Sequence, residues 1–253
     1  MRRVLILGGT AEARALAATL TNDPTLHVIS SLAGRVTNPR LPEGEVRQGG
    51  FGGPDGLAAY IRDQAITAVI DATHPFAQQM TTSALQATTR TATPFLLLRR
   101  PPWHPTPTDN WHHADSLTAA ATLLTTHNHT RAFLTTGRRS LPAFTPLTHL
   151  WFLARSVDPP NPPIPPNVQI LLARGPYTVP GELSLMRTHR IDVLITKNSG
   201  GQMTTAKLTA ARDLSLPVIM IDRPPPPPGV PYAETVEAAS AWLRTGEAAA
   251  QTG

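Results

Sequence analysis

Residues 2–20 read RRVLILGGTAEARALAATL, a stretch that predicts a strand, a glycine turn and a helix. Val4–Leu7 is a short, continuous apolar run, which is typical of a parallel strand buried on both faces. Gly8 and Gly9 allow a sharp turn and a close approach of the backbone to another group. Good helix formers follow, and the first turn of a helix suits a phosphate because its N–H groups are free and its dipole is positive there. The stretch predicts a phosphate or nucleotide site, with an ordinary strand-to-helix turn as the alternative.

A chain of 253 residues is long enough for one large α/β domain or two small ones. Only four strongly apolar residues precede the glycines, so we expect no signal peptide, and no apolar stretch approaches the length of a membrane span. The chain has no cysteine, which excludes disulfides, thiolate metal sites and cysteine nucleophiles. We expect a cytoplasmic monomer without a metal site.

The net charge of +5 and the pI near 10.4 raise the question of a nucleic-acid partner. However, the basic residues are scattered, and aromatic residues make up only 5% of the chain, which argues against nucleic-acid binding. An anionic small molecule in a basic cleft explains the positive charge equally well. We therefore expect a small anionic ligand, and neither nucleic acid nor a membrane as partner.

A second strand is expected over residues 26–31, and it leads into Leu32-Ala33-Gly34-Arg35. In a dinucleotide-binding fold the end of this strand faces the adenosine ribose, where an acidic residue favours NAD. This chain has Ser31 and Arg35 there, which suit the 2′-phosphate of NADPH. A solvated loop arginine is the alternative for Arg35. The glycine-rich turn at 49–53 predicts either a close approach to a ligand or a plain loop.

Residues 68–77, AVIDATHPFA, predict a buried strand that ends in polar residues. Asp71, Thr73 and His74 would then lie at the carboxyl end of a strand, where open α/β sheets bind their ligands. His74 can exchange a proton near neutral pH. The alternative is structural, with Thr73 as a helix cap and with Asp71 and His74 bracing the turn.

The proline-rich stretch that begins at Pro101 marks the expected domain boundary. We expect an N-terminal dinucleotide-binding domain over 1–104, a linker over 105–115 and a C-terminal α/β domain over 116–253. Strands and helices alternate in both halves, which predicts two mainly parallel sheets flanked by helices. Because polar and glycine residues follow the strands in each half, we expect a ligand cleft between the two domains.

Several motifs occur in the second half of the chain: Thr135-Thr136-Gly137, Gly175-Pro176-Tyr177, Thr196-Lys197-Asn198-Ser199-Gly200-Gly201 with Lys207, and Arg223-Pro224. Those of the first half are Leu7–Arg14, Ser31–Arg35, Asp71–Ala77 and Arg99–Trp103. With these motifs in this order, nearly the whole chain resembles the precorrin-6A reductase family of cobalamin (vitamin B12) biosynthesis. The stretch at 71–77 is the most specific match, whereas Asp is common in the family where this chain has Asn198.

The resemblance implies a two-domain, Rossmann-like oxidoreductase that uses a reduced nicotinamide cofactor to reduce the macrocycle of precorrin-6A, giving precorrin-6B. Ser31 and Arg35 favour NADPH as that cofactor. We assign cofactor binding to Gly8, Gly9, Thr10, Arg14, Ser31, Arg35, Asp71 and Thr73. The substrate carries many carboxylates, which Arg and Lys bind well. We assign substrate binding to Thr136, Tyr177, Lys197, Ser199, Gly200, Gly201 and Lys207. The candidate catalytic proton donors are His74, Tyr177 and Lys197, with ordered water as a further possibility.

Two other functions are compatible with these residues. One is the NADH-dependent counterpart that acts on cobalt-precorrin-6A in the anaerobic branch. Arg35 favours the NADPH enzyme over this counterpart. The other is a non-catalytic, two-domain α/β protein that binds a nucleotide or another anion. It would bind its ligand without oxidising a nicotinamide cofactor in the presence of any tetrapyrrole.

Overall fold

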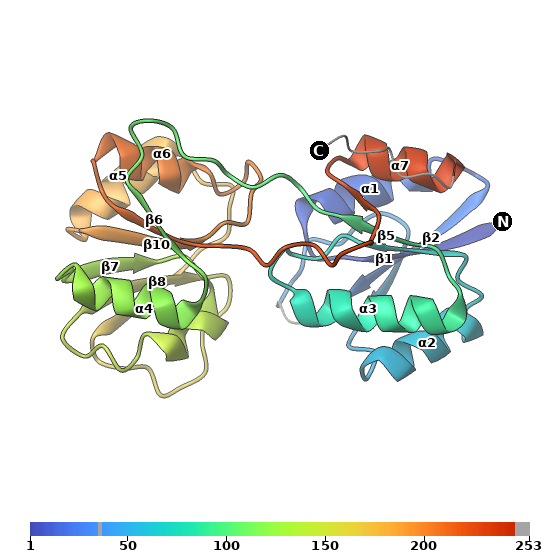
Figure 1. The fold of residues 1–253 in the computed structure, drawn as a ribbon, viewed down its shortest axis with the longest axis horizontal. Coiled ribbons are helices and arrows are strands. Elements are labelled where there is room, and N and C mark those ends of the chain that lie inside the picture. The colour runs from blue at the N-terminus through green and yellow to red at the C-terminus, as the bar shows by residue number, and fades with distance from the viewer. Residues whose placement is uncertain (35–36, 246–253) are drawn as a thin grey trace. The chain divides into compact units, whose positions relative to one another are not determined.

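The computed structural model describes residues 1–34 and 37–245, which form two compact α/β units (Figure 1). Unit 1 contains residues 1–101 together with the chain from Pro224 onward, and unit 2 contains residues 102–223. Each unit is built on a six-stranded sheet in which all paired strands are parallel. The expected α/β class with two parallel sheets is confirmed.

Unit 1 has the strand order β12-β5-β4-β1-β2-β3. Its elements are β1 (Arg2–Leu7), α1 (Ala11–Thr21), β2 (Leu26–Leu32), β3 (Glu45–Gln48), α2 (Pro54–Asp63), β4 (Ala68–Asp71), α3 (Gln78–Thr91), β5 (Phe95–Leu98), β12 (Tyr232–Ala233) and α7 (Val236–Thr245). Val4 to Leu7 are all buried, because alternate side chains of β1 point to opposite faces of the sheet and both faces are covered. Helices α1 and α7 pack with Val4 and Ile6, whereas α2 and α3 pack with Leu5 and Leu7.

Unit 2 has the strand order β6-β11-β10-β7-β8-β9. Its elements are β6 (Trp111–Ala114), α4 (Leu117–Thr126), β7 (Arg131–Leu134), the 3₁₀ helix η1 (Arg138–Ala143), β8 (Trp151–Ser156), β9 (Val168–Leu172), α5 (Val179–Thr188), β10 (Val193–Lys197), α6 (Ala206–Asp213) and β11 (Val218–Ile221). Helices α5 and α6 pack against one face of this sheet through Met186, Leu208 and Ala211. Figure 1 shows α4 on the opposite face.

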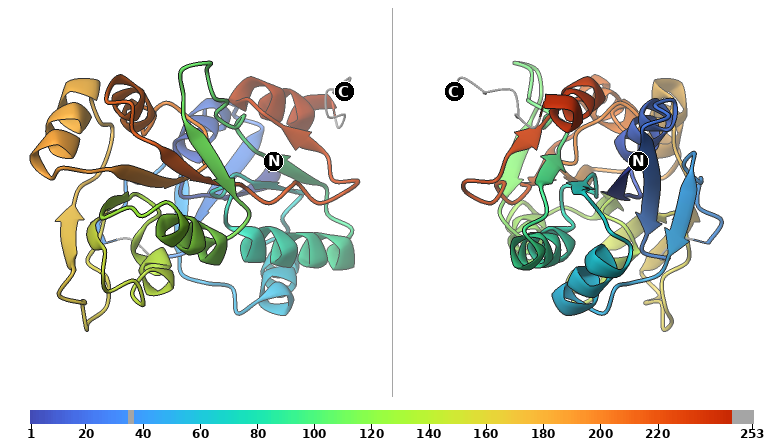
Figure 2. Two further views of the ribbon diagram at one scale, coloured as in Figure 1. Left: turned by 60° about the vertical axis from the view of Figure 1, so that its left-hand side comes forward. Right: turned by 90° about the vertical axis from the view of Figure 1, so that its right-hand side faces the viewer.

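The domain boundaries differ from those expected. The chain returns to unit 1 at Pro224, where β12 pairs with β5 and α7 packs against α1 (Figures 1 and 2). Residues 224–245 therefore do not belong to a C-terminal domain that starts at 116. The proposed linker over 105–115 also contains β6, which pairs with β11. The sequence Trp-His-His-Ala of β6 has no apolar run to reveal a strand, and the apolar face of α7 completes the core beside α1 rather than that of unit 2.

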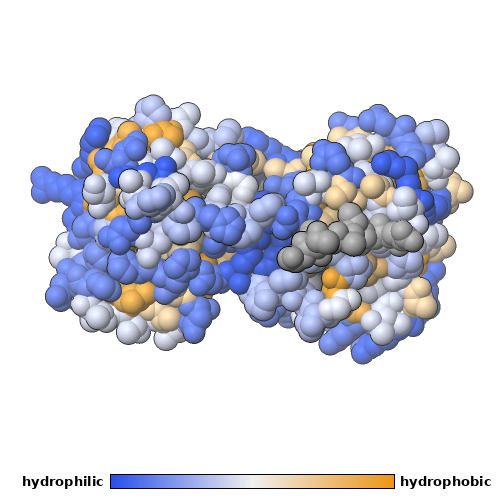
Figure 3. All heavy atoms as spheres, turned by 45° about the horizontal axis from the view of Figure 1, so that its top comes forward, coloured by the Kyte–Doolittle hydropathy of each residue, from blue (hydrophilic) through white to orange (hydrophobic). Residues whose placement is uncertain are grey.

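Hydrophilic residues cover most of the face shown in Figure 3, with apolar residues in small separate groups. The large apolar side chains that are exposed lie apart along the chain: Met1, Leu41, Val157, Ile164 and Leu172. In the described parts of the chain no helix combines the length and the hydropathy that a bilayer crossing requires.

Candidate functional site

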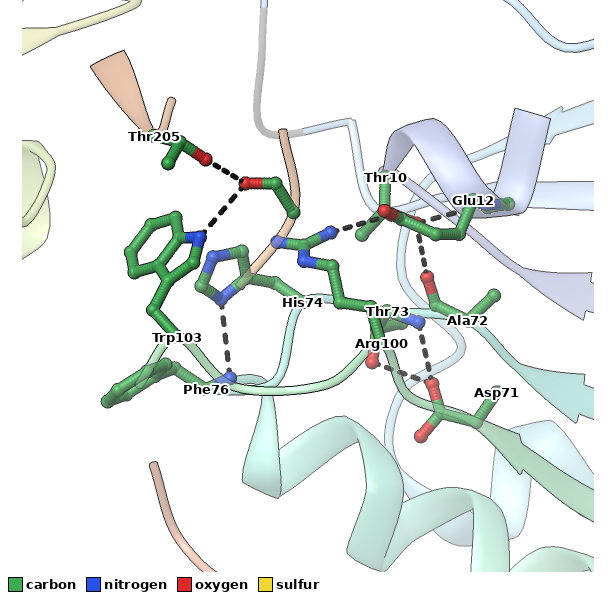
Figure 4. Close-up of polar contacts among 12 residues, drawn as sticks. Thr10, Glu12, Asp71, Ala72, Thr73, His74, Phe76, Arg100, Trp103 and Thr205 are labelled. Atoms are coloured by element: carbon green, nitrogen blue, oxygen red, sulfur yellow. Dashed lines mark hydrogen bonds and ion pairs between the residues drawn. The ribbon is translucent and has the colours of Figure 1, made fainter. Parts of the chain in front are cut away.

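The loop Gly8-Gly9-Thr10 joins β1 to α1 as the sequence predicts. Gly9 has a φ of +115°, and a side chain at this position would meet no atom within 4 Å. The Thr10 hydroxyl caps α1, since it accepts a hydrogen bond from the N–H of Ala13 at 3.1 Å. It also donates to the carbonyl oxygen of Ala72 at 2.8 Å, which ties α1 to the end of β4 (Figure 4). A ligand here would therefore meet backbone N–H groups, because the Thr10 hydroxyl is already occupied.

A small open pocket lies beside this loop. It is lined by Gly8, Gly9, Ala13, Arg14, Ser30, Leu32, Arg40 and Pro42. Ser30 is 1% exposed, and its hydroxyl has no hydrogen-bond partner among the described residues. An unsatisfied buried hydroxyl is costly, so a ligand that hydrogen-bonds Ser30 would relieve that cost. With two arginines in the same lining, the pocket suits an anion such as a phosphate.

The two residues proposed for the 2′-phosphate differ in what the structure shows of them. Ser31 is buried, and its hydroxyl accepts a hydrogen bond from Arg47 at 3.3 Å. Arg47 also donates to the carbonyl oxygens of Gly49 and Gly50 and lies 3.8 Å from the Phe51 ring centre. These contacts brace the start of the glycine-rich turn. Arg35 lies outside the described residues.

Asp71, assigned to cofactor binding from the sequence, is buried at the end of β4 and braces the turn that follows. The residue is 0% exposed, and its carboxylate accepts hydrogen bonds from Thr73 N–H at 3.0 Å, Thr73 Oγ1 at 2.6 Å and Thr81 Oγ1 at 2.6 Å (Figure 4). Burial raises the pKa of Asp71, although the hydroxyl and N–H donors oppose that shift. These contacts are the ones that the bracing alternative predicts, and a role of Asp71 in cofactor binding stays a prediction.

His74 and Thr73 complete the same turn. Thr73 does not cap α3, which begins at Gln78, and its hydroxyl is donated to Asp71. His74 is exposed, and its Nδ1 accepts a hydrogen bond from the N–H of Phe76 at 3.3 Å (Figure 4). His74 is therefore accessible to a ligand, whereas the polar groups behind it hold the turn in place.

Two arginines at the end of β5 fix the surroundings of this loop. Arg100 pairs with Glu12 in the first turn of α1, with 2.6 Å between Nη1 and Oε2 (Figure 4). Arg99 donates to the carbonyl oxygen of Pro224, where the chain re-enters unit 1. The exit of β5 thus connects α1 with the returning C-terminal segment.

In unit 2, the loop after β10 holds Trp103 through both its backbone and its ring. Asn198 accepts from the Trp103 N–H at 2.9 Å and donates to the Trp103 carbonyl oxygen at 3.1 Å. The indole N–H of Trp103 donates to the Gly201 carbonyl oxygen at 3.1 Å, which also accepts from Thr205 (Figure 4). Gly200 and Gly201 have positive φ angles of +66° and +81°. Asn198 therefore acts as an anchor for Trp103.

A buried charged cluster lies next to this anchor. Arg155 on β8 and Glu182 on α5 form a two-pronged ion pair, with Nη1–Oε1 at 2.5 Å and Nη2–Oε2 at 3.0 Å. The Tyr177 ring centre lies 3.7 Å from the Arg155 guanidinium carbon, and the Tyr177 hydroxyl donates to Ala173 O at 3.0 Å. Lys207 on α6 faces the same pair, and its Nζ lies 5.1 Å from the centre of the Trp103 ring. The structure thus brings Tyr177 and Lys207 together, as their shared assignment requires, and adds Arg155, Glu182 and Trp103.

The remaining substrate-side residues lie at the carboxyl ends of neighbouring strands. Thr136 follows β7 and lines a pocket that also includes Arg138, Arg155 and Ser156. Lys197 ends β10, and burial lowers its pKa. Ser199 is buried in the loop that follows. Because β7 and β10 are adjacent in the sheet, Thr136 and Ser199 lie at the same sheet edge.

The family model described as "Precorrin-6x reductase CbiJ/CobK" matches residues 3–244 of the chain. The chain belongs to the precorrin-6x reductase family. A precorrin-6A reductase of Rhodococcus erythropolis is 55% identical over 97% of this chain and 98% of its own length. One of Mycobacterium tuberculosis is 48% identical over 96% and 98%. The solved structure of CobK precorrin-6A reductase superposes with a TM-score of 0.91, at 40% identity and with full coverage of both chains.

Membership in the precorrin-6x reductase family makes this chain an oxidoreductase of a two-unit α/β type. Five residues of the candidate sites were not assigned from the sequence: Ser30, Arg40, Trp103, Arg155 and Glu182. Arg40 lies in a loop without hydrophobic periodicity, so the sequence could not predict that it lines the pocket beside Gly8 and Gly9. Arg155 carried a sign, because a charged residue within the apolar strand run Trp-Phe-Leu-Ala-Arg-Ser predicts a buried partner of opposite charge.

Proposed function

We propose that the chain catalyses the NADPH-dependent reduction of precorrin-6A to precorrin-6B in cobalamin biosynthesis. The observation that carries the proposal is the pocket beside Gly8 and Gly9, where Arg14, Arg40 and the unpartnered Ser30 hydroxyl line one space. Relatives named precorrin-6A reductase match nearly the whole chain, and this favours the same substrate here. The metal-free macrocycle is thus preferred over its cobalt-containing counterpart.

Unit 1 would bind the cofactor. The backbone of Gly8, Gly9 and Thr10 at the start of α1 would hold the pyrophosphate, because free N–H groups and the helix dipole favour anions there. Ser31 and Arg35 would lie near the adenosine ribose, and Arg14, Ser30 and Arg40 line the adjacent pocket. Arginines suit a 2′-phosphate, so NADPH is preferred over NADH. The bound nicotinamide would supply the hydride for one ring carbon.

Unit 2 would bind the substrate. Thr136, Tyr177, Lys197, Ser199, Gly200, Gly201 and Lys207 carry this assignment, and the anchor at Trp103 keeps their loop in one conformation. The substrate presents acetate and propionate carboxylates, which lysine and backbone N–H groups can bind. The protein would mainly hold two reactants in one orientation, since the hydride chemistry belongs to the cofactor.

A proton must reach a neighbouring ring carbon, and three side chains are candidates. Burial raises the pKa of Tyr177, which makes it a weaker acid than an ordinary tyrosine, and its hydroxyl is donated to Ala173. Burial lowers the pKa of Lys197, which makes its ammonium a stronger acid than an ordinary lysine. His74 is exposed at the edge of unit 1. We propose Lys197 and His74 ahead of Tyr177 as proton donors.

The test is to incubate the protein with precorrin-6A and NADPH while following absorbance at the nicotinamide band. We expect oxidation of NADPH that depends on the tetrapyrrole. Parallel reactions with NADH and with cobalt-precorrin-6A separate the anaerobic counterpart from the proposed enzyme. Binding of NADPH without oxidation by either tetrapyrrole would identify a nucleotide-binding protein instead. Arg35→Ala should weaken NADPH binding by about 1.5–3 kcal/mol, the size of a charge-assisted contact.

A further inference from the structure

Lys207 belongs to a buried cluster that contains more positive than negative charge. Three charged side chains meet there from three elements: Arg155 from β8, Glu182 from α5 and Lys207 from α6. Arg155 binds both carboxylate oxygens of Glu182. The single acid is therefore paired with the arginine, and the lysine is the second cation.

The Lys207 ammonium has no hydrogen-bond acceptor among the described residues, although an ammonium can donate three hydrogen bonds. The residue as a whole is 4% exposed. The face of the Trp103 ring, 5.1 Å away, attracts a cation more weakly than a carboxylate would. The cluster of Arg155, Glu182 and Lys207 therefore lacks an anion that would pair with the Lys207 ammonium.

The electrostatics of the cluster agree with this count. Burial is the main cause that lowers the pKa of Lys207 to about 7, Arg155 lowers it further, and Glu182 opposes the shift. Tyr177, which packs on Arg155, supplies no negative charge at neutral pH, since burial raises the pKa of its phenol further above the ordinary value. Without a ligand, the surroundings of Lys207 therefore favour the uncharged amine more than water does.

The composition of the chain points to the same residue. Of 22 basic residues, only two are lysines, Lys197 and Lys207, and the other 20 are arginines. Arginine does not lose its proton in proteins, whereas a buried lysine readily does. A chain that uses arginine elsewhere has its two lysines ten residues apart in unit 2, at the end of β10 and on α6. Both positions have a lowered pKa.

We propose that Lys207 binds a carboxylate group of the substrate and takes up one proton from solution as that carboxylate binds. The proposal rests on the proposed function, because it takes the substrate to be an anionic tetrapyrrole. The incoming carboxylate supplies the missing anion and the missing hydrogen-bond acceptor. The bond formed is N–H at Nζ, and the proton comes from the solvent. Above pH 7 the affinity for the substrate then falls by up to tenfold for each pH unit, because binding consumes a proton.

The two-lysine composition allows a direct test. In protein labelled with ¹³C at the lysine Cε, the whole chain gives two side-chain signals, which Lys197→Arg and Lys207→Arg assign. We expect Lys207 to titrate near neutral pH in the free protein and above pH 9 in the presence of precorrin-6A and NADP⁺, which cannot turn over. NADP⁺ alone should leave its titration unchanged.

Matched variants give a second readout. Lys207→Arg keeps the charge and should bind precorrin-6A with an affinity that no longer depends on pH between 7 and 9. Lys207→Met should lose at least tenfold in affinity while its NMR spectrum stays that of a folded protein. Arg187→Ala, an exposed cation on α5, serves as the control with wild-type affinity and pH dependence.

The outcomes that overturn the proposal are distinct from a failure of the proposed function. If precorrin-6A binds and is reduced but the Lys207 signal does not move, the inference is wrong and the function stands. A shift caused by NADP⁺ alone would assign the anion to a cofactor phosphate and overturn the carboxylate. If precorrin-6A does not bind to the wild-type protein at all, the proposed function fails and the inference fails with it.

Discussion

Five strands follow the same order in the two sheets, and only the edge strand beside β5 or β11 differs, because β12 comes late in the chain and β6 comes before the other strands of unit 2. Even so, the loop at the same place in each sheet is different. β1 in unit 1 and β7 in unit 2 are both fourth in the order of their sheets. After β1, two glycines lead into α1 with 11 residues, whereas after β7 the chain enters the six-residue 3₁₀ helix η1. An α-helix of three turns offers a dipole and aligned N–H groups, and a short 3₁₀ helix offers much less of both. The sheet provides the scaffold in both units, and the loops decide the ligand.

The two units also differ in how their buried charged groups are balanced by neighbouring groups. Asp71 in unit 1 is enclosed by hydroxyl and N–H donors, so its hydrogen-bonding needs are met within the unit. The cluster in unit 2 contains two cations and one acid. One buried group thus braces a turn with its acceptors filled, while the other sets two cations against one acid. Buried charge on its own does not mark a binding site, and the balance of charge decides.

The largest expected effect comes from breaking the buried ion pair of unit 2. Glu182→Ala leaves Arg155 and Lys207 buried without an acid, which should lower the free energy of unfolding by about 3–5 kcal/mol. Hydrogen exchange followed by mass spectrometry should show the loss in peptides of unit 2, with unit 1 protected as before. The double variant Arg155→Met with Glu182→Leu replaces the pair by apolar residues and should restore most of the stability. Wild-type protection in Glu182→Ala would contradict the account of the cluster.

The next effect concerns the pocket of unit 1. Arg40→Ala should weaken NADPH binding by about 1.5–3 kcal/mol, the size of one hydrogen bond to a charged group, and leave NADH binding unchanged. Isothermal titration of both cofactors measures the difference. Arg139→Ala, an exposed arginine of unit 2, is the control. An equal loss of affinity for NADPH and NADH would place Arg40 near a phosphate that both cofactors share, and not near the 2′-phosphate.

A smaller effect distinguishes the helix caps of the two units. Thr10 is buried and makes two hydrogen bonds, to Ala13 N–H and to Ala72 O, whereas Thr178 accepts one from Gly181 N–H at 3.3 Å in an exposed position. Thr10→Ala should cost about 1–2 kcal/mol of stability, and Thr178→Ala less than about 1 kcal/mol. Urea unfolding measures both values. Thr10→Ser should keep most of the wild-type stability, and a full loss in that variant would show that the methyl group is what matters.

Much of the fold follows from local patterns in the sequence. The apolar run of β1, the glycines and the helix formers of α1 predict this strand, turn and helix correctly, because all three signals lie within 20 consecutive residues. The return of β12 and α7 to unit 1 depends on which of two apolar faces they cover, and no local pattern carries that choice. β6 was not predicted as a strand, because its sequence Trp-His-His-Ala has the polar character of a loop.

The candidate site likewise contains residues that a local sequence pattern reveals and residues that only folding brings together. Gly8, Gly9 and Arg14 were found because strand–glycine–helix is a local pattern, and they line one pocket. The contacts of Asp71 with the hydroxyls of Thr73 and Thr81 could not be predicted, because a polar residue at a strand end looks the same in sequence whether it faces a ligand or its own unit. Arg40 joins the pocket through folding of the loop after β2, which sequence spacing cannot show.

The smallest effect is a pH response that should be confined to unit 2. His112 on β6 lies 4.8 Å from His127 between ring centres, and His129 follows in the same turn after α4. Burial lowers the pKa of His112 and of His129, and the neighbouring histidines add to the shift, while Asp192 opposes it at His129. Below pH 6.5 the unfolded chain therefore binds more protons than the folded one, so acidification destabilises the folded state.

The free energy of unfolding of unit 2 should thus fall as the pH is lowered from 7.5 to 5.5, by less than about 1 kcal/mol for each histidine because solvent screens these partly exposed groups. Hydrogen exchange at the two pH values, corrected for the intrinsic rate, compares unit 2 with unit 1 in one sample. His127→Gln removes a neighbouring charge from both His112 and His129 and should reduce the loss. If unit 1 weakened as much as unit 2 on acidification, the histidine cluster would not be its cause.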